Sequence, residues 1–286
     1  MPVNPGANSL AIESAPHSSQ AAPVPTPILA IANQKGGVGK TTTAVNLSAC
    51  LALRGRRILL VDLDAQANAT SGLGLEKLEG GSVYRPLLGE GTLLERIRPT
   101  SVRNLSMVPS EFDLCGAEIE LARTDDYLNG LKRALTPVRD SGDFDLIVID
   151  CAPSLGILTL NAFAVADHLI VPLQCEYYAL EGIAMVTRIL QQVREGGLNP
   201  HLELMGVVMT MFDGRTKLAN NVVAEVRSHF GERVFETLIP RTTRLAEAPS
   251  HGQPIMTYDP YSAGAAAYDV FAGEVVQRLK WSESSA

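Results

Sequence analysis

A short run of lysines, glycines and threonines offers the chemistry of a polyphosphate site: Gln34-Lys35-Gly36-Gly37-Val38-Gly39-Lys40-Thr41-Thr42. The glycines let backbone N–H groups curl around phosphate oxygens. Lys40 would reach the β- and γ-phosphates of a nucleotide, and the Thr41 hydroxyl would ligate Mg²⁺. The run therefore predicts a phosphate-binding loop that takes a nucleoside triphosphate with magnesium.

The segments on either side of the loop supply the support that this chemistry needs. An apolar run over 28–32 precedes it, and residues 44–53 have the apolar spacing of a helix. Strand, glycine-rich turn and helix place the positive end of a helix dipole against the phosphates. The local pattern therefore agrees with the predicted loop.

One position departs from the general phosphate-loop pattern. That pattern begins with glycine five positions before Gly39, where this chain has Gln34, and an additional lysine, Lys35, precedes the glycines. One phosphate cradle does not need two lysines, so Lys35 is expected to have another target. The alternative is a solvated loop charge.

Two aspartates follow apolar strand patterns further along the chain. The run 57–62 leads into Asp64, and the run 144–149 ends at Asp150. Asp64 is expected near the γ-phosphate, where a carboxylate can orient the attacking water; an ordinary aspartate at a loop entry is the alternative. Asp150 is expected near Mg²⁺, through a water molecule.

Apolar β-rich runs alternate with helical patterns, which predicts an α/β fold: a doubly wound, mostly parallel sheet flanked by helices. Further strands are expected at 168–173, 204–210 and 234–239, and helices at 125–138, 218–230 and 263–280. Ligands of such sheets bind at the carboxyl ends of the strands. Between residues 73 and 105 the sequence shows no clear strand or helix pattern.

Composition indicates a soluble cytoplasmic protein of 286 residues with net charge −7 and 46% hydrophobic residues. No apolar run approaches the roughly 20 residues of a membrane-spanning helix. Residues 1–27 contain six prolines and no lysine or arginine, and are predicted to be a disordered tail before a single domain over 28–286. The four cysteines lack metal-ligand or C-x-x-C spacing.

Several motifs together resemble those of the ParA/Soj chromosome-partitioning ATPases, within the ParA/MinD deviant Walker A superfamily. They are K-G-G-x-G-K-T at 35–41, D-x-D-x-Q-x-N at 62–68, D-x-A-P-S at 150–154, Q-C-E-Y-Y-A-L-E-G at 174–182, and I-P-R with L-x-E-A-P-S-x-G over 239–252. The resemblance spans about residues 28–280. It implies a P-loop ATPase that uses ATP and Mg²⁺.

The resemblance also assigns roles to particular residues. Lys35 is expected to reach the nucleotide of a second subunit, so that ATP closes a homodimer. Lys35, Lys40 and Asp64 are the expected catalytic residues, and Thr41, Asp64 and Asp150 the magnesium site. The expected ATP-binding residues are Lys35, Gly36, Gly37, Val38, Gly39, Lys40, Thr41, Thr42, Pro240 and Arg241.

By the same resemblance, the ATP-bound dimer is expected to hold double-stranded DNA without sequence preference, and a ParB-type centromere-binding protein to stimulate hydrolysis and release. Six basic residues stand against three acidic ones between 215 and 244, and Arg215, Lys217 and Arg244 are the candidate DNA contacts. The protein would then be nucleoid-associated.

Two other functions of related ATPases are weighed against this one. A MinD-like or other positioning ATPase for a non-DNA cargo is the alternative, although the ending Arg278-Leu279-Lys280-Trp281 is a weak membrane-binding pattern. A nitrogenase-type iron–sulfur reductase needs a cysteine shortly after the second switch, and after Cys151 the next cysteine is Cys175.

Overall fold

The computed structural model describes residues 25–176 and 179–281. Within them, one eight-stranded sheet has the order β3-β4-β2-β5-β1-β6-β7-β8, and every neighbouring pair is parallel except β3 and β4. The strands are β1 (Ile28–Ile31), β2 (Ile58–Leu63), β3 (Arg98–Pro99), β4 (Leu105–Val108), β5 (Leu146–Cys151), β6 (His168–Gln174), β7 (Glu203–Phe212) and β8 (Val234–Pro240). The predicted α/β fold with a mostly parallel sheet is confirmed.

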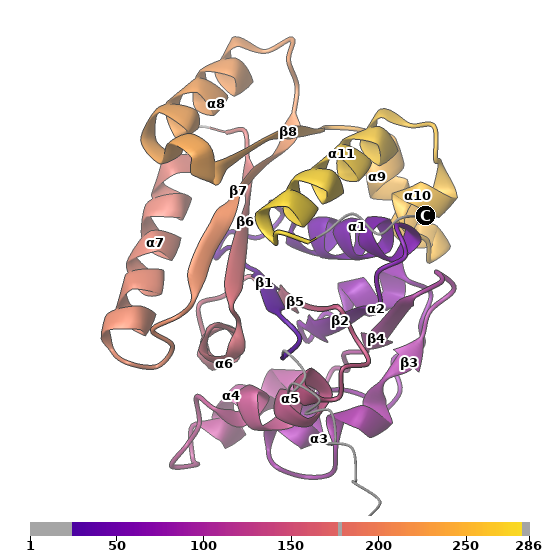
Figure 1. Ribbon diagram of the computed structural model, residues 1–286, viewed down its shortest axis with the longest axis vertical. Helices are drawn as coiled ribbons and strands as arrows, with labels where there is room; N and C mark the ends of the chain where they lie inside the picture. Colours follow the sequence, from indigo (N-terminus) through magenta and orange to yellow (C-terminus); the bar gives the residue numbers. More distant parts are fainter. Residues whose placement is uncertain (1–24, 177–178, 282–286) are drawn as a thin grey trace, which may run out of the picture.

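Helices connect these strands and cover both faces of the sheet (Figure 1). The α-helices are α1 (Lys40–Leu53), α2 (Asn68–Gly72), α3 (Tyr84–Leu87), α4 (Leu114–Leu121), α5 (Gly130–Asp140), α6 (Ile157–Val165), α7 (Ala179–Glu195), α8 (Lys217–Phe230), α9 (Thr243–Glu247), α10 (Ile255–Tyr258) and α11 (Ala263–Arg278), and the 3-10 helices are η1 (Leu93–Arg96), η2 (Gly231–Arg233) and η3 (Ala248–His251). The region between 73 and 105 contains only short elements.

Strand residues alternate between two hydrophobic cores, one on each face of the sheet. In β1, Ile28 and Ala30 lie in the core beneath α4 to α8, whereas Leu29 and Ile31 lie in the core beneath α1 and α11. Side chains alternate along a strand, so a strand that is apolar at every position must be covered on both faces. This pattern explains why the continuous apolar runs form central parallel strands.

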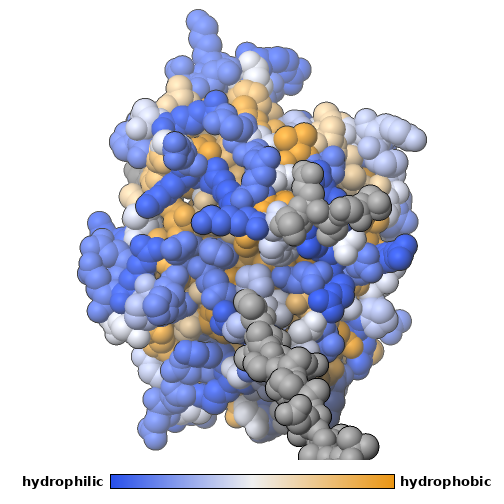
Figure 2. Space-filling model, viewed as in Figure 1, coloured by the Kyte–Doolittle hydropathy of each residue, from blue (hydrophilic) through white to orange (hydrophobic). Residues whose placement is uncertain are grey.

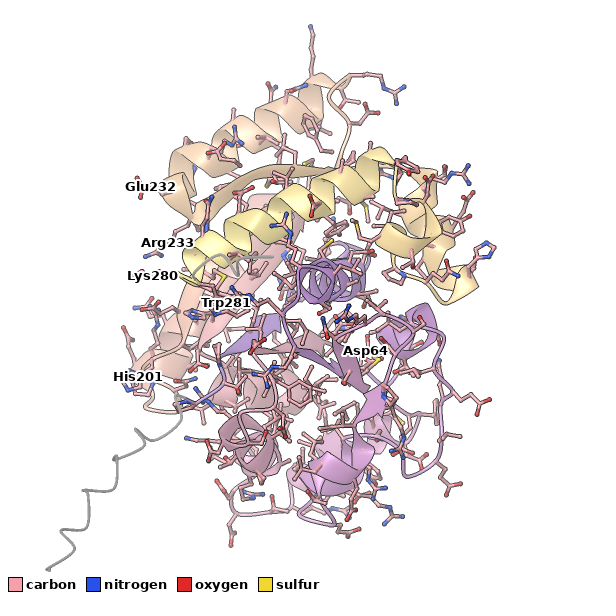
Figure 3. All side chains as sticks on the ribbon, turned by 45° about the vertical axis from the view of Figure 1, so that its right-hand side comes forward. Asp64, His201, Glu232, Arg233, Lys280 and Trp281 are labelled. Carbon is pink, nitrogen blue, oxygen red and sulfur yellow. The ribbon has the colours of Figure 1, made fainter. Side chains whose placement is uncertain are left out.

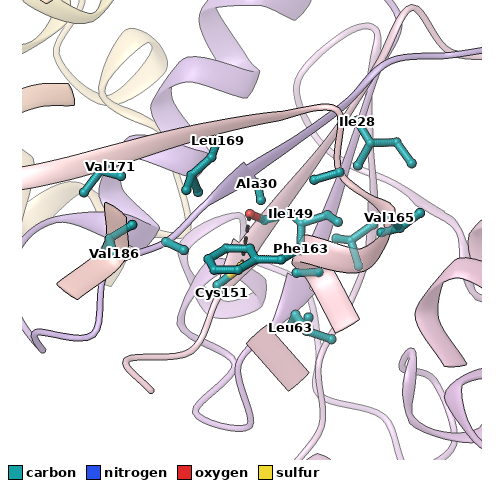
Figure 4. Close-up of a cluster of buried hydrophobic side chains, with 14 of the residues drawn as sticks. Ile28, Ala30, Leu63, Ile149, Cys151, Phe163, Val165, Leu169, Val171 and Val186 are labelled. Carbon is teal, nitrogen blue, oxygen red and sulfur yellow. Dashed lines mark hydrogen bonds between the residues drawn. The ribbon is translucent and has the colours of Figure 1, made fainter. Parts of the chain in front are cut away.

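Cys151, the last residue of β5, belongs to the first of these cores. Its thiol lies among buried apolar side chains that include Phe163 and Leu63 (Figure 4). Burial raises the pKa of this thiol, and the neighbouring Asp150 carboxylate raises it further. The residue is therefore a packed core thiol, with no thiolate available for chemistry.

The face seen in Figure 2 is largely hydrophilic, with small apolar areas between polar side chains. Among the described residues, no helix combines the length and apolar character needed to cross a membrane.

Residues 1–24 of the predicted tail lie outside the described residues. Thr26, near its end, is buried: its N–H donates to Arg139 O at 3.1 Å and its hydroxyl to Phe144 O at 2.9 Å. The packed structure therefore includes residues just before β1.

Gly206 marks the place where α11 crosses the amino end of β7. The guanidinium of Arg278 lies over the ring of Phe235, 3.8 Å from its centroid, and donates to carbonyls of Met205 and Val234. A Cβ at Gly206 would collide with Arg278 Nη1 and would lie 2.7 Å from Arg233 O. Only glycine leaves room for this arginine.

Gly206→Ala should therefore destabilise the protein by about 1–3 kcal/mol, because the strand or the arginine must move. Urea unfolding followed by circular dichroism measures the change. Gly116→Ala in α4 is the matched control, since a Cβ there meets nothing within 4 Å. Alanine favours a helix over glycine, so the control should be neutral or about 0.5–1 kcal/mol more stable. Equal stabilities for the two variants would contradict this account.

Candidate functional site

The predicted phosphate loop joins β1 to α1 at the carboxyl edge of the sheet. Gly37 and Gly39 have φ of 73° and 86°, a left-handed conformation that glycine adopts without strain. Gly39 is the N-cap of α1, and within the described residues no side-chain cap bonds the N-terminal N–H groups of this helix. These donors are therefore free to bind an anion, as the sequence predicted.

Two hydrogen bonds hold the loop against neighbouring strands. Asn33 donates from its side-chain amide to Pro172 O in β6 at 2.8 Å. Thr210, in β7, donates from its hydroxyl to Val38 O at 2.8 Å. The loop is thus fixed by residues far away in the sequence, and Thr210 is a site residue that the sequence analysis did not identify.

Lys40 begins α1, and its side chain is largely buried. Its ammonium group donates to Lys35 O at 3.0 Å, so the loop carbonyl holds it at the mouth of the cradle. Burial lowers the pKa of Lys40, while the carboxylates of Asp150 and Asp64 oppose that shift. The lysine and both predicted aspartates therefore share one electrostatic environment.

Asp62 and Asp150 are register partners at the ends of the neighbouring strands β2 and β5, and both are fully buried. Burial raises the pKa of Asp62 to about 6, an effect that hydrogen bonds from Thr70 reduce. Burial and the Asp62 carboxylate raise the pKa of Asp150 well above its ordinary value; the neighbouring Thr41 hydroxyl and Lys40 ammonium offset this in part.

Neither carboxylate oxygen of Asp150 accepts a hydrogen bond of ordinary geometry from the described residues; the Thr41 hydroxyl is near enough to lower the pKa of Asp150 but is not placed to bond it. A buried carboxylate without a partner is costly, and a cation with its water shell would satisfy it. No cluster of three or more potential metal ligands occurs in the described part of the chain. Mg²⁺ characteristically takes one or two carboxylates and completes its shell with water and substrate phosphates, so these residues fit it.

The loop and Asp64 line one cavity of about 680 Å³, which we call the phosphate cavity. Its lining residues are Gly37, Gly39, Lys40, Thr41, Thr42, Asp64, Asn68, Pro153 and Met211. Figure 3 shows Asp64 on the side of the sheet away from His201 and Arg233, which precede β7 and β8. The predicted loop residues and Asp64 therefore meet at the carboxyl edge, as expected for this fold.

A second cavity of about 600 Å³ adjoins the first, and we call it the β8 cavity. Its lining residues are Gly39, Thr42, Thr210, Met211, Ile239, Pro240, Arg241, Thr242, Leu245, Ala246 and Tyr268. Gly39, Thr42 and Met211 line both cavities, which places Pro240 and Arg241 next to the phosphate site.

Besides Thr210, the sequence analysis missed Met211 and Tyr268, which also line these cavities. Met211 adopts φ of 51°, uncommon for a residue with a long side chain, at the end of β7. The end of a parallel strand was the signal that could have identified it. Tyr268 comes from α11 and pairs with Thr43 through their hydroxyls at 3.2 Å; no local motif marks it.

Lys35, Gly36 and Val38 do not line either cavity. The Lys35 ammonium lies 3.2 Å from one carboxylate oxygen of Glu176, whose other oxygen lies 3.8 Å from Arg241. Both partners of the Lys35 ion pair are more than 40% exposed, so the pair is weak. Lys35 is therefore held at the surface by a contact that a stronger anion could replace, and Glu176 is a further missed residue.

The candidate DNA contacts follow β7 and β8: Arg215 lies in the loop before α8, Lys217 begins α8 and Arg244 lies in α9. The Arg215 side chain is 90% exposed and forms an ion pair with Asp213 at 2.7 Å, and Lys217, the first residue of α8, is exposed. Arg244 forms ion pairs with Glu247 at 3.2 Å and with Asp259 at 3.3 Å. Acidic neighbours therefore offset the charges of both arginines.

The unpaired Asp150 carboxylate generates a stability prediction. An acid whose pKa is raised by folding stabilises the protein below its unfolded pKa of about 4, and that stability is lost as pH rises through the folded pKa. Without nucleotide and magnesium, the wild-type protein should lose stability relative to Asp150→Asn as the pH rises above about 4. At pH 8 the variant should be at least about 1 kcal/mol more stable.

Urea unfolding at pH 5 and pH 8 measures this difference, and added Mg²⁺ with a nucleotide should favour the wild-type protein instead. Asp145→Asn at the opposite, amino end of β5 is the control. Hydrogen bonds from Arg57 lower the pKa of Asp145 despite its partial burial, so this change should destabilise. If Asp150→Asn is less stable than the wild-type protein at pH 8, the Asp150 carboxylate has a hydrogen-bond partner in the folded protein.

Comparison with known proteins adds an independent line of evidence. A family model described as an AAA domain matches residues 26–204. The sporulation initiation inhibitor protein Soj of Bacillus subtilis is 51% identical over 249 residues, which cover 87% of this chain and 97% of that protein. The chromosome-partitioning ATPase Soj of Thermus thermophilus is 52% identical and covers 88% of this chain and 96% of its own length.

Solved structures agree with this comparison. One similar structure is a Mycobacterium smegmatis protein described as cobyrinic acid a,c-diamide synthase, with bound ADP and magnesium. It is 38% identical to this chain and has a TM-score of 0.77; the match covers 90% of this chain and 96% of that one. The septum site-determining protein MinD of Pyrococcus horikoshii, complexed with Mg-ADP, has a TM-score of 0.74 at 26% identity, covering 91% and 100%.

The phosphate loop with its additional lysine, the aspartates at neighbouring strand ends and about 50% identity over nearly nine-tenths of the chain lead to the same assignment. The chain belongs to the ParA/Soj family of chromosome-partitioning ATPases, within the AAA-domain family.

Proposed function

We propose that the protein is an ATP-dependent DNA-segregation ATPase. Its ATP-bound dimer binds DNA and releases the DNA after ATP hydrolysis. The observation that carries the proposal is the convergence of Lys40, Thr41 and Asp64 on one cavity, with Asp150 unpaired beside them. Relatives named as chromosome-partitioning proteins are 46 to 52% identical to this chain.

ATP would occupy the two adjoining cavities. The phosphates would lie against the N-terminus of α1 and Lys40, and the base in the β8 cavity beside Pro240 and Arg241. Thr41, with Asp64 and Asp150 nearby, would hold Mg²⁺, Asp150 through water. The magnesium would neutralise charge that develops on the phosphates.

Asp64 would orient the water that attacks the γ-phosphate. It lines the phosphate cavity together with loop residues, and phosphoryl transfer asks the protein chiefly for positioning and charge stabilisation. Lys40 would stabilise charge on the transferred group, and its contact with Lys35 O would be exchanged for one with phosphate.

Lys35 would act across the dimer. It lies outside both cavities of its own subunit, in an exposed ion pair with Glu176. A triphosphate carries more charge than one carboxylate, so a nucleotide in a facing subunit would displace Glu176. ATP would in this way close two subunits over two nucleotides.

The dimer would bind double-stranded DNA without sequence preference through Arg215, Lys217 and Arg244, and would therefore be associated with the nucleoid. A ParB-type partner would stimulate hydrolysis and so release the DNA. Positioning of a non-DNA cargo, as by a MinD-like ATPase, is the alternative function. Trp281 packs against the hydrophobic core, and the Arg56 guanidinium lies over its ring, 4.9 Å from the ring centroid. These contacts favour a packing role for Trp281 over membrane insertion.

The two lysines of the loop should have separable roles under this proposal. Lys40→Ala should abolish ATP binding, because the buried ammonium is lost from the phosphate cavity. Lys35→Ala should bind ATP but stay monomeric, since its side chain lies outside that cavity. Calorimetric titration and sizing chromatography with ATP measure the two properties.

Lys132→Ala, which removes an exposed lysine on α5, serves as the control and should dimerise normally. An ATP-dependent dimer formed by Lys35→Ala would rule out the role of Lys35 across the interface.

A further prediction tests the DNA surface. With four to six phosphate contacts per dimer, the log–log dependence of affinity on salt should have a slope of about −4 to −5. Arg215→Glu should weaken binding to all sequences alike and make the slope shallower by about 2, since each dimer loses two contacts. Titration of the ATP-bound Asp64→Ala protein onto unrelated duplexes, at several salt concentrations, measures both effects.

Arg85→Glu is the matched control, because Arg85 is also exposed and ion-paired, with Glu90 at 2.9 Å, and the net charge changes equally. Equal losses in the two variants would indicate a general charge effect. Absence of binding by the parent dimer at low salt would favour the non-DNA alternative.

A further inference from the structure

We propose that Ser110 is a positioning residue for Asp64, and that its hydroxyl sets the kcat of ATP hydrolysis through the Asp64 backbone. The inference rests on the proposed function, in which Asp64 orients the attacking water. Ser110 follows β4, the neighbour of β2 in the sheet, and lies outside the motifs that the sequence analysis identified.

Ser110 makes two hydrogen bonds to the segment that carries Asp64. Its hydroxyl donates to Asp64 O at 2.7 Å, and its N–H donates to the Thr70 hydroxyl oxygen at 2.9 Å. Ser110 is 1% exposed, so water does not compete for either bond. These bonds bridge 46 and 40 positions of the sequence.

Asp62 closes the network from the other side. One of its carboxylate oxygens accepts from the Thr70 N–H at 2.8 Å and hydroxyl at 2.7 Å, and the other accepts from the Asp64 N–H at 3.3 Å. Asp64 is therefore held at its N–H by Asp62 and at its carbonyl by Ser110. Both anchors are buried and neither touches the phosphate cavity.

The segment needs such support because its own structure is weak. Ala67 has φ of 51°, and α2, which follows it, has only five residues. So short a helix is not stable alone. The Asp64 carboxylate itself is held within the described residues by the N–H of Gln66 at 3.0 Å, a local contact that moves with the loop.

Satisfaction of a buried carbonyl does not explain the Ser110 hydroxyl. Asp64 O also accepts from the Ala67 N–H at 2.8 Å, so it keeps a partner when the hydroxyl is removed. What is lost is the anchor to β4. Ser110→Ala should therefore alter the placement of Asp64 much more than it alters folding.

The test is single-turnover hydrolysis of γ-labelled ATP by excess full-length protein, with nucleotide affinity and melting temperature measured in parallel. Ser110→Ala should lower the hydrolysis rate about 10- to 100-fold, the effect of a misplaced catalytic group. Its ATP dissociation constant should stay within about twofold, and its melting temperature should fall by about 2–4 °C. Ser141→Ala, which removes an exposed hydroxyl bonded to Val138 O beyond α5, should keep the wild-type rate.

A double-mutant cycle separates positioning from general loosening. If Ser110 acts through Asp64, the Asp64→Ala and Asp64→Ala/Ser110→Ala proteins should hydrolyse ATP at the same residual rate. Thr70→Ser keeps the hydroxyl that Ser110 and Asp62 share, so its rate should stay within about threefold of wild type; Thr70→Val should behave like Ser110→Ala.

The outcomes distinguish this inference from the proposed function. If the wild-type protein hydrolyses ATP and Ser110→Ala does so at the same rate, the inference is overturned but the proposed function stands. The same holds if Ser110→Ala lowers the rate further in the Asp64→Ala background. A wild-type protein that binds ATP without hydrolysing it, or an active Asp64→Ala protein, would instead contradict the proposed function.

Discussion

The burial of charge at the carboxyl edge of the sheet is the constraint on which the rest of the structure depends. Asp62 and Asp150 stand side by side on neighbouring strands without exposure to water, and Lys40 is buried beside them. The Asp62 carboxylate raises the pKa of Asp150, and the Asp150 carboxylate lacks a hydrogen bond within the described residues. A cation and a polyanion between these groups would satisfy all of them.

Asp62 and Asp150 differ in their hydrogen bonds. Asp62 is fully occupied with Thr70 and the Asp64 backbone, so it serves the structure of the loop. Asp150 is unpaired, so it is the one available to a hydrated cation. Two residues of the same type at equivalent strand ends are thus distinguished by their hydrogen bonds, which is a common way for one fold to give similar groups different tasks.

The site also links segments that are distant in the chain. Thr210 of β7 holds Val38 of the loop, Arg241 and Lys35 share Glu176, and Ser110 after β4 holds Asp64. Each link ends at a group that would contact or flank the nucleotide.

Local patterns in the sequence predicted the class of fold, which the structure confirms, and the phosphate loop with a set of candidate groups for ATP and magnesium. Those signals are local: apolar runs predict parallel strands, glycines with a following helix predict a cradle, and an aspartate after a strand lies at the carboxyl edge. The helix predicted at 125–138 begins only at Gly130 in the structure. Its start is set by Asn161 of α6, whose side-chain oxygen accepts from the Leu131 N–H, and no local pattern contains that contact.

The contacts that hold the site residues could not be read from the sequence. Thr210, Tyr268, Glu176 and Ser110 come from separate strands, helices and loops, and their roles depend on hydrogen bonds across 40 or more positions. The pairing of Arg215 with Asp213 and of Arg244 with Glu247 and Asp259 likewise depends on side-chain placement. Spacing along a chain reveals which groups lie at a sheet edge, whereas partnership between groups from different segments depends on how those segments pack.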